Sequence, residues 1–249
     1  AEMNDRIAGG PERAALISSE MFYGLPPEVL LDRLPALRDR PLHVLVYLRR
    51  QDRYIEAKFL QKARNARFFG TLAEFVEKFG GSGADYAAEL QPWQDLADVT
   101  LVPRVLERAQ LAGGDVVSDA LNLIGLPLPA AVPIADANVS PGFHRMQLLQ
   151  AAAVAGIVDP RRLQRALAAQ FPQAAEDRAP ILSPAERRAF LAQYAEGNEA
   201  LRRRHFPDRS ALFDLSDLES AASPTGIPPF TQAQMAEMQR LLQVMKGLL

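Results

Sequence analysis

The segment Leu-His-Val-Leu-Val-Tyr-Leu, residues 42–48, constrains the fold more than any other part of the sequence. It is almost continuously apolar, and it contains the β-branched and aromatic residues that favour β-strands. A strand with one solvated face would alternate apolar and polar residues, and this segment does not. We therefore expect a strand that is covered on both faces, as strands are in a parallel sheet.

The segments around this strand alternate between strand-like and helix-like patterns. Strands that alternate with helices are typical of an α/β domain with a parallel sheet. We therefore expect an α/β fold. The candidate strands are 13–22, 42–48 and 98–103, and the candidate helices are a short one within 24–41, then 51–66, 71–79 and 115–126.

The last third of the sequence is helical in pattern. Segments near 142–156 and 160–170 fit helices. Ser183-Pro184-Ala185-Glu186 combines an N-cap, a proline at the first helical position and a capping glutamate. It predicts a long helix that continues to about Arg204.

We divide the chain into an α/β domain of residues 1–216, a linker of residues 217–230 and a C-terminal amphipathic helix of residues 231–249. The linker contains Ala-Ala-Ser-Pro-Thr-Gly-Ile-Pro-Pro, which is typical of a turn-rich connection. Apolar residues of the final helix recur at alternating spacings of three and four, but the seam is too short to hold a dimer alone. We expect this helix to pack against the rest of the chain or against a neighbouring chain, in a homo-oligomer or with another partner.

Composition limits the classes of function. The formal net charge of −2 argues against a general binder of nucleic acid or anionic membranes. The absence of cysteine excludes disulfides, thiolate metal sites and a cysteine nucleophile. His43, His144 and His205 lack metal-ligand spacing, so we expect no metal. No segment approaches the roughly 20 apolar residues that span a bilayer, and we expect a cytoplasmic protein without a membrane span.

Two arginines, Arg49 and Arg50, directly follow the 42–48 strand. Ligands of open parallel sheets gather at the carboxyl ends of the strands. Residues 49–67 hold seven basic and two acidic residues, a local balance of 7 − 2 = +5. Guanidinium groups fit pairs of phosphate or sulfate oxygens, and a helix start adds N–H donors. The pattern indicates an anion site, or else a solvated helix whose basic residues pair with acidic neighbours.

Residues 46–61, Val-Tyr-Leu-Arg-Arg-Gln-Asp-Arg-Tyr-Ile-Glu-Ala-Lys-Phe-Leu-Gln, resemble the 3′-phosphate-binding segment of P-loop sulfotransferases. The likeness is greatest to bacterial sulfotransferase-like proteins associated with polysaccharide modification. It implies a P-loop NTPase-like fold, a parallel sheet flanked by helices, and 3′-phosphoadenosine 5′-phosphosulfate as cosubstrate. In the family, an arginine at the strand end and a serine eight residues later contact the 3′-phosphate. Arg49 matches the arginine, but Ala57 occupies the serine position, so one hydroxyl donor is missing. Further similar segments are 15–22, 99–126, 138–149 and 195–213, so the likeness covers about residues 13 to 215.

One part of the family pattern is missing from the sequence. Sulfuryl transfer in this fold uses a loop between the first strand and first helix, with a lysine or arginine, to hold the 5′-phosphosulfate. None of the glycine clusters follows a strand and opens a helix with Lys-Ser or Lys-Thr. Either the segment that carries the loop precedes Ala1, or the protein is a degenerate member that no longer transfers sulfate. Loss of a central strand would expose apolar flanks, which favours the first explanation.

The resemblance implies transfer of a sulfuryl group to a hydroxyl of a carbohydrate acceptor. The alternative is a non-catalytic binding or scaffolding protein with the same fold, and a small-molecule kinase fits less well because no Walker lysine is visible. Arg49 would bind the 3′-phosphate, with Arg50 and Ala57 in the same segment. Arg104 would make a second anion contact, or else pair with Glu107.

Other side chains have less specific signals. Glu20 is a candidate general base for the acceptor hydroxyl, or else a capping or salt-bridged glutamate. Ser18 and Ser19 could donate hydrogen bonds to cosubstrate or acceptor, or else form a turn. Trp93 and Tyr86 could stack on a sugar or purine, although a lone tryptophan is more often part of the core.

Overall fold

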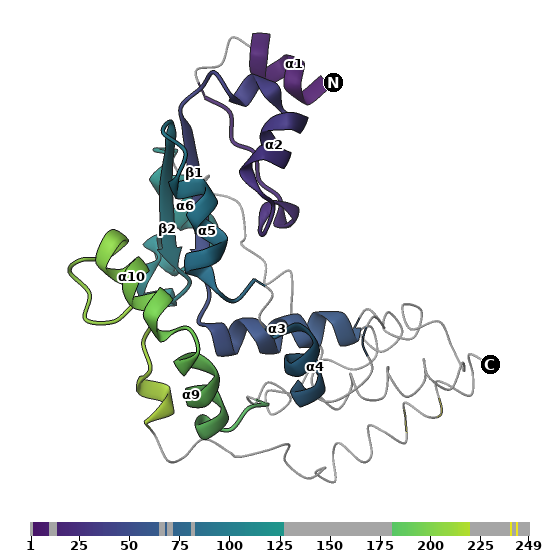
Figure 1. Cartoon of the computed structure of the whole chain (residues 1–249), viewed down its shortest axis with the longest axis vertical. Helices are drawn as coiled ribbons and strands as arrows, with labels where there is room; N and C mark the ends of the chain where they lie inside the picture. The colour runs from purple at the N-terminus through teal and green to yellow at the C-terminus, as the bar shows by residue number, and fades with distance from the viewer. Residues whose placement is uncertain are drawn as a thin grey trace. The chain divides into compact units, whose positions relative to one another are not determined.

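The computed structural model describes residues 2–9, 14–64, 68, 72–80, 83–126, 181–219, 240 and 243 (Figure 1). The chain forms two compact units. The first comprises residues 1–50, 81–130 and 193–214, and the second comprises residues 51–80, 131–192 and 215–249.

A two-stranded parallel sheet lies in the first unit. Its strands are β1 (Leu42–Leu48) and β2 (Val99–Val105), and Leu42 lies opposite Val99 in their register. The predicted strand 42–48 is confirmed, and the predicted strand 98–103 is confirmed with its end two residues further along. The chain is therefore a mixed helix and sheet protein with a small parallel sheet.

Helices cover the two faces of this sheet. Side chains alternate between faces along a strand, so Leu48 and Tyr47 lie on opposite sides. Leu48 packs with α5 (Tyr86–Gln94) and α10 (Ala195–His205), whereas Tyr47 contacts α6 (Val116–Leu123). The buried residues of the α5 and α10 side are Leu48, Tyr86, Leu90, Val105, Leu201, Leu212 and Phe213.

A second cluster of the first unit joins its N-terminal elements, which are α1 (Glu2–Gly9), α2 (Pro27–Arg33) and η2 (Pro35–Leu37). Its buried members are Ile7, Leu31 and Leu37, and Leu42 at the start of β1 packs against them. The short predicted helix within 24–41 is confirmed as α2, and Pro27 begins it because a proline at this position sacrifices no helical hydrogen bond.

The second unit is helical in its described residues. It contains α3 (Gln51–Arg64), α4 (Leu72–Phe79), α9 (Pro184–Ala192) and η6 (Ser216–Leu218). Between α3 and α4, Phe59, Phe68, Phe75 and Phe79 pack with ring centroids 4.9 to 6.2 Å apart. Most of these ring pairs are edge-to-face, an arrangement that aromatic quadrupoles favour.

The remaining short elements connect strands and helices of the first unit. They are η1 (Glu20–Phe22), η3 (Arg108–Gln110) and η4 (Ala112–Gly114). The helix α6 that follows them begins where Asp115 accepts a hydrogen bond from Ser118 N at 2.9 Å, and it ends near Gly125 with φ of +71°. The predicted helix 115–126 is thereby confirmed as α6.

Two predicted elements are wrong in the described residues. Residues 14–19, within the predicted strand 13–22, have no regular structure, and Leu16 is 67% exposed. No described strand pairs with them, so their backbone gains no ladder hydrogen bonds. The predicted helix 183–204 is two helices, α9 and α10, because Tyr194 between them has a non-helical backbone and is buried. Burial of that ring outweighs the helix propensity of its neighbours.

Several predictions lie outside the described residues. These are the helices near 142–156 and 160–170, and most of the linker 217–230 and the helix 231–249. Within the last segment Arg240 and Gln243 are helical.

Candidate functional site

Arg49 extends from the carboxyl end of β1 with an exposed side chain. Its carbonyl oxygen accepts a hydrogen bond from the hydroxyl of Tyr86, which is buried on α5. Within the described part of the chain, no hydrogen bond or ion pair holds the Arg49 guanidinium. A fixed main chain therefore carries a cationic side chain that is available to a ligand.

Arg50 is buried, with 4% of its surface exposed. Its Nη1 donates to the carbonyl oxygen of Asp214 at 2.6 Å. Glu107, two residues after the end of β2, holds the same segment, because its Oε1 accepts a hydrogen bond from Asp214 N at 2.8 Å and its Oε2 pairs with Arg209 at 3.1 Å. These contacts fix the segment that ends at Asp214 beside the carboxyl ends of both strands.

Arg104 pairs with Asp119 of α6. The alternative prediction, that Arg104 pairs with Glu107, is wrong. Arg104 Nη2 lies 2.7 Å from Asp119 Oδ1, and its Nε lies 3.0 Å from Oδ2. Tyr47, which is opposite Arg104 in the register, donates to the same Oδ2 at 2.9 Å. Ala112 N donates to Oδ1 at 2.9 Å, so the fully buried carboxylate has four hydrogen bonds.

These contacts change the protonation of the cluster. The hydrogen bond from Arg104 holds the pKa of Asp119 below its usual range. Burial, followed by the hydrogen bond to Asp119, raises the pKa of Tyr47 well above its ordinary value. Arg104 Nη1 has no hydrogen-bond partner among the described residues, and 29% of the side chain is exposed. This nitrogen is the part of the cluster that could contact an anion.

The other predicted site residues lie in different surroundings. Glu20 is exposed on η1, and Ser18 is exposed before it. The Ser19 hydroxyl accepts a hydrogen bond from Met21 N at 3.1 Å, so it forms the expected turn. Ala57 is half-buried on α3 in the second unit.

Both aromatic candidates, Trp93 and Tyr86, are buried, with exposed fractions of 7% and 3%. Tyr86 belongs to the core around Leu48, and its ring lies 6.3 Å from that of Phe213. In this structure both side chains therefore serve the core rather than a surface on which a sugar could stack.

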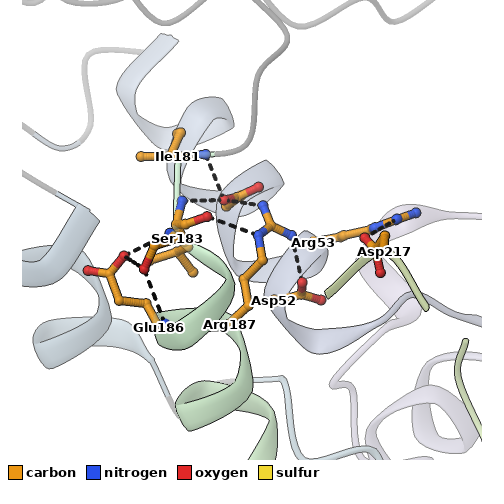
Figure 2. Close-up of polar contacts among 9 residues, drawn as sticks. Asp52, Arg53, Ile181, Ser183, Glu186, Arg187 and Asp217 are labelled. Carbon is orange, nitrogen blue, oxygen red and sulfur yellow. Dashed lines mark hydrogen bonds and ion pairs between the residues drawn. The ribbon is translucent and has the colours of Figure 1, made fainter. Parts of the chain in front are cut away.

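The second unit holds a buried ionic network that the sequence did not predict (Figure 2). Arg187 of α9 donates to Asp52 at 2.6 Å and to Glu56 at 2.6 Å, both on α3. Glu56 also accepts hydrogen bonds from Ile181 N and Leu182 N, at 2.9 and 2.8 Å. The network fixes α9 and the segment before it against α3.

A capping box adjoins this network. Ser183 N donates to Glu186 Oε2 at 2.8 Å, and Glu186 N donates to Ser183 Oγ at 3.3 Å, as predicted. The hydrogen bond from the Ser183 hydroxyl lowers the pKa of Glu186. The spacing of Asp52 and Glu56, one helical turn apart, was the sequence signal for a shared partner.

No group of histidine, aspartate or glutamate side chains among the described residues is arranged to hold a metal ion. The described helices also include none that is long and apolar enough to cross a membrane.

Comparison with known proteins gives little further information. No family model matches the chain, and no solved structure matches it. An uncharacterized protein of Archaeoglobus fulgidus is 28% identical over 117 residues, which are 47% of this chain and 31% of that protein. The chain thus spans less than a third of the length of this relative. The similarity assigns neither a family nor an activity.

Proposed function

We propose that the chain binds the 3′-phosphate of 3′-phosphoadenosine 5′-phosphosulfate through Arg49 and acts in sulfuryl transfer to a hydroxyl of a carbohydrate. The supporting observation is the exposed Arg49 guanidinium at the carboxyl end of a parallel strand, without an ion pair in the described residues. Ligands of parallel sheets gather at this edge, and a guanidinium matches two phosphate oxygens at once. Residues 46–61 resemble the 3′-phosphate-binding segment of P-loop sulfotransferases, which have a P-loop NTPase-like fold. This likeness is the reason why we propose the 3′-phosphate as the ligand of Arg49.

The described residues suit the 3′-phosphate better than the phosphosulfate. Arg49 offers a whole guanidinium, and Arg104 offers its Nη1 at the end of the neighbouring strand. Arg50 is buried against the Asp214 carbonyl, so it adds positive potential rather than a second exposed fork. Among the described residues no glycine-rich loop with a lysine follows a strand, and we therefore derive no step for the leaving phosphate.

The acceptor side of the reaction requires a base. The cosubstrate supplies the sulfuryl group, whose bond to the phosphate oxygen breaks as a bond to the acceptor oxygen forms. The products are adenosine 3′,5′-bisphosphate and a sulfate ester, and the hydroxyl proton passes to a base. Glu20 is the proposed base because its exposed carboxylate lies in the same unit as Arg49.

A second candidate function is nucleotide binding without transfer. The observation that favours it is Ala57, where the family has a serine that contacts the 3′-phosphate. A hydrogen bond to a charged group contributes about 1.5–3 kcal/mol, so its absence should weaken binding. A chain that binds the nucleotide but transfers no sulfate would be a binding or scaffolding protein.

Calorimetric titration of adenosine 3′,5′-bisphosphate tests the phosphate site. We expect the wild type to bind and Arg49→Ala to lose at least tenfold in affinity. Arg33→Ala, which removes an exposed arginine at the end of α2 in the same unit, should bind like the wild type. Equal binding by wild type and Arg49→Ala would exclude Arg49 from the site.

A transfer assay separates the two candidate functions. Incubation with sulfur-labelled cosubstrate and a panel of polysaccharides should label a carbohydrate, and Glu20→Gln should lower the rate without changing the affinity for the bisphosphate. Binding without any transfer would favour the non-catalytic candidate. A rate unchanged in Glu20→Gln would exclude Glu20 as the base.

A further inference from the structure

The main chain of Arg49 lies between the end of a strand and the start of a helix. β1 ends at Leu48 and α3 begins at Gln51. At this end of the sheet, Leu106 N donates to the Leu48 carbonyl at 2.8 Å. The first hydrogen bond of an α-helix is accepted by the carbonyl of the residue before it, which here is Arg50. The Arg49 carbonyl therefore belongs to neither ladder, and its partner must come from elsewhere in the fold.

The hydroxyl of Tyr86 is this partner, because it donates a hydrogen bond to the Arg49 carbonyl. Tyr86 is the first residue of α5, which packs against the sheet (Figure 1). Its ring is buried, with its centroid 6.5 Å from that of Tyr23 and 6.3 Å from that of Phe213. Since the neighbouring rings hold the phenol ring in place, the hydroxyl meets the Arg49 carbonyl from a fixed direction.

Two hydrogen bonds together fix the direction in which the Arg49 side chain leaves the main chain. The bond from Leu106 N holds the peptide group between Leu48 and Arg49. The bond from Tyr86 holds the peptide group between Arg49 and Arg50. Peptide groups are planar, so the two planes beside a residue can turn only through its φ and ψ angles. With both planes held, the Cα–Cβ direction of Arg49 is set, and the guanidinium extends from one anchored point.

We infer that Tyr86 is a positioning residue of the phosphate site and that its hydroxyl acts on the ligand through Arg49. The inference rests on the proposed function and adds a buried residue to it. The physical reason is preorganisation, because folding has already ordered the main chain at Arg49 before the phosphate arrives. Without the hydroxyl, the peptide group after Arg49 can rotate, and this order has to be imposed during binding. The ring of Tyr86 belongs to the core, and only its hydroxyl acts on the site.

Tyr86→Phe tests the inference, because it removes the hydroxyl and keeps the ring. A hydrogen bond between neutral groups changes an equilibrium constant by about three- to tenfold. The affinity for adenosine 3′,5′-bisphosphate should therefore fall about three- to tenfold in calorimetric titration. The affinity for adenosine 5′-monophosphate should stay the same, because this nucleotide has no 3′-phosphate for Arg49 to bind. A general loss of structure would instead weaken the binding of both nucleotides.

Tyr23→Phe is the matched control. The Tyr23 hydroxyl donates to the Gly83 carbonyl at 2.6 Å, and its ring packs edge-to-face against that of Tyr86. The substitution removes the same kind of hydrogen bond from the same region but leaves the Arg49 carbonyl with its partner. It should lower the melting temperature about as much as Tyr86→Phe does and bind the bisphosphate like the wild type. In a chain that already carries Arg49→Ala, Tyr86→Phe should not change the affinity further.

A spectroscopic measurement without nucleotide tests the positioning itself. The chain contains no cysteine, so Arg49→Cys provides a single site for a nitroxide label. The electron paramagnetic resonance spectrum of the label reports how freely this position moves. Adding Tyr86→Phe should shift the spectrum towards faster motion, because the peptide group after residue 49 is released. Adding Tyr23→Phe should leave the spectrum unchanged.

Failure of the inference and failure of the proposed function give different results. If Tyr86→Phe keeps the full preference for the bisphosphate, or if the nitroxide spectrum does not change, Tyr86 does not position Arg49, whereas Arg49 keeps its proposed role. Equal losses for both nucleotides, or a Tyr23→Phe variant that binds as weakly as Tyr86→Phe, would also overturn the inference. A wild type that does not prefer the bisphosphate would overturn the proposed function and, with it, the role of Tyr86.

Discussion

Replacing Arg187 by alanine should destabilise the second unit strongly. The guanidinium donates to Asp52 and Glu56 at 2.6 Å each and to the Leu182 carbonyl at 3.1 Å. The substitution would leave two carboxylates without their cation, and the Asp52 side chain is fully buried while that of Glu56 is 13% exposed. Removal of the cation from two carboxylates that stay largely buried is the main cause of the expected loss.

Removal of one partner from a buried ion pair costs about 3–5 kcal/mol. Glu56 would keep its hydrogen bonds from Ile181 N and Leu182 N. Asp52 lies in the first turn of α3, where the helix dipole stabilises a negative charge. Because both carboxylates keep some compensation, we expect the lower part of this range, about 3 kcal/mol.

Urea unfolding followed by far-ultraviolet circular dichroism measures this loss. Arg188→Ala is the matched control, since Arg188 is the exposed neighbour on α9 and donates one hydrogen bond, to the Leu218 carbonyl at 2.6 Å. It should lose no more than about 1 kcal/mol. In a chain that already carries Asp52→Asn and Glu56→Gln, Arg187→Ala should lower the free energy of unfolding much less, because no buried carboxylate charge then loses the Arg187 cation. Equal losses for Arg187→Ala and Arg188→Ala would refute the reasoning.

Three further predictions concern the first unit. Asp119→Asn should lower the free energy of unfolding by about 1–3 kcal/mol at neutral pH, because the charge that pairs with Arg104 is lost. The pKa of Asp119 is lowered in the folded state, so the difference in stability between the variant and the wild type should shrink as acid protonates Asp119. The pKa of Tyr47 is raised in the folded protein, so the unfolded chain loses the phenolic proton at a lower pH than the folded chain does. The free energy of unfolding should therefore fall as pH rises above about 10. Tyr47→Phe should reduce that fall in urea titrations at alkaline pH. Burial lowers the pKa of His205, whose Nε2 has no hydrogen-bond partner among the described residues. As pH drops, the unfolded chain therefore takes up a proton on this imidazole before the folded chain does, and the free energy of unfolding should fall below about pH 6.5. His205→Gln should reduce this acid sensitivity in thermal melts, whereas His43→Gln, at an exposed position, should not.

Elements with local signals were predictable from the sequence. The bounds of β1 match the apolar run 42–48, and α6 lies within the predicted helix 115–126. The capping box at Ser183 and Glu186 also forms as expected. In each case the deciding interactions lie within a few residues of one another.

Features that depend on distant partners were not predictable. The apolar core of residues 13–22 indicates a strand, but a strand forms only when another one pairs with it. Arg104 pairs with Asp119 on a following helix rather than with the nearby Glu107, and sequence spacing alone could not choose between them. Arg187 meets Asp52 across 135 positions, so only the spacing of the acidic residues on α3 hinted at the network.

The 3′-phosphate itself gives the most direct test of the proposed function. Adenosine 3′,5′-bisphosphate and adenosine 5′-monophosphate differ only in this group, so the ratio of their affinities reports its contact with the protein. We predict that the wild type prefers the bisphosphate at least tenfold and that Arg49→Ala binds both nucleotides equally. A preference that survives in Arg49→Ala, or a wild type without any preference, would contradict the account.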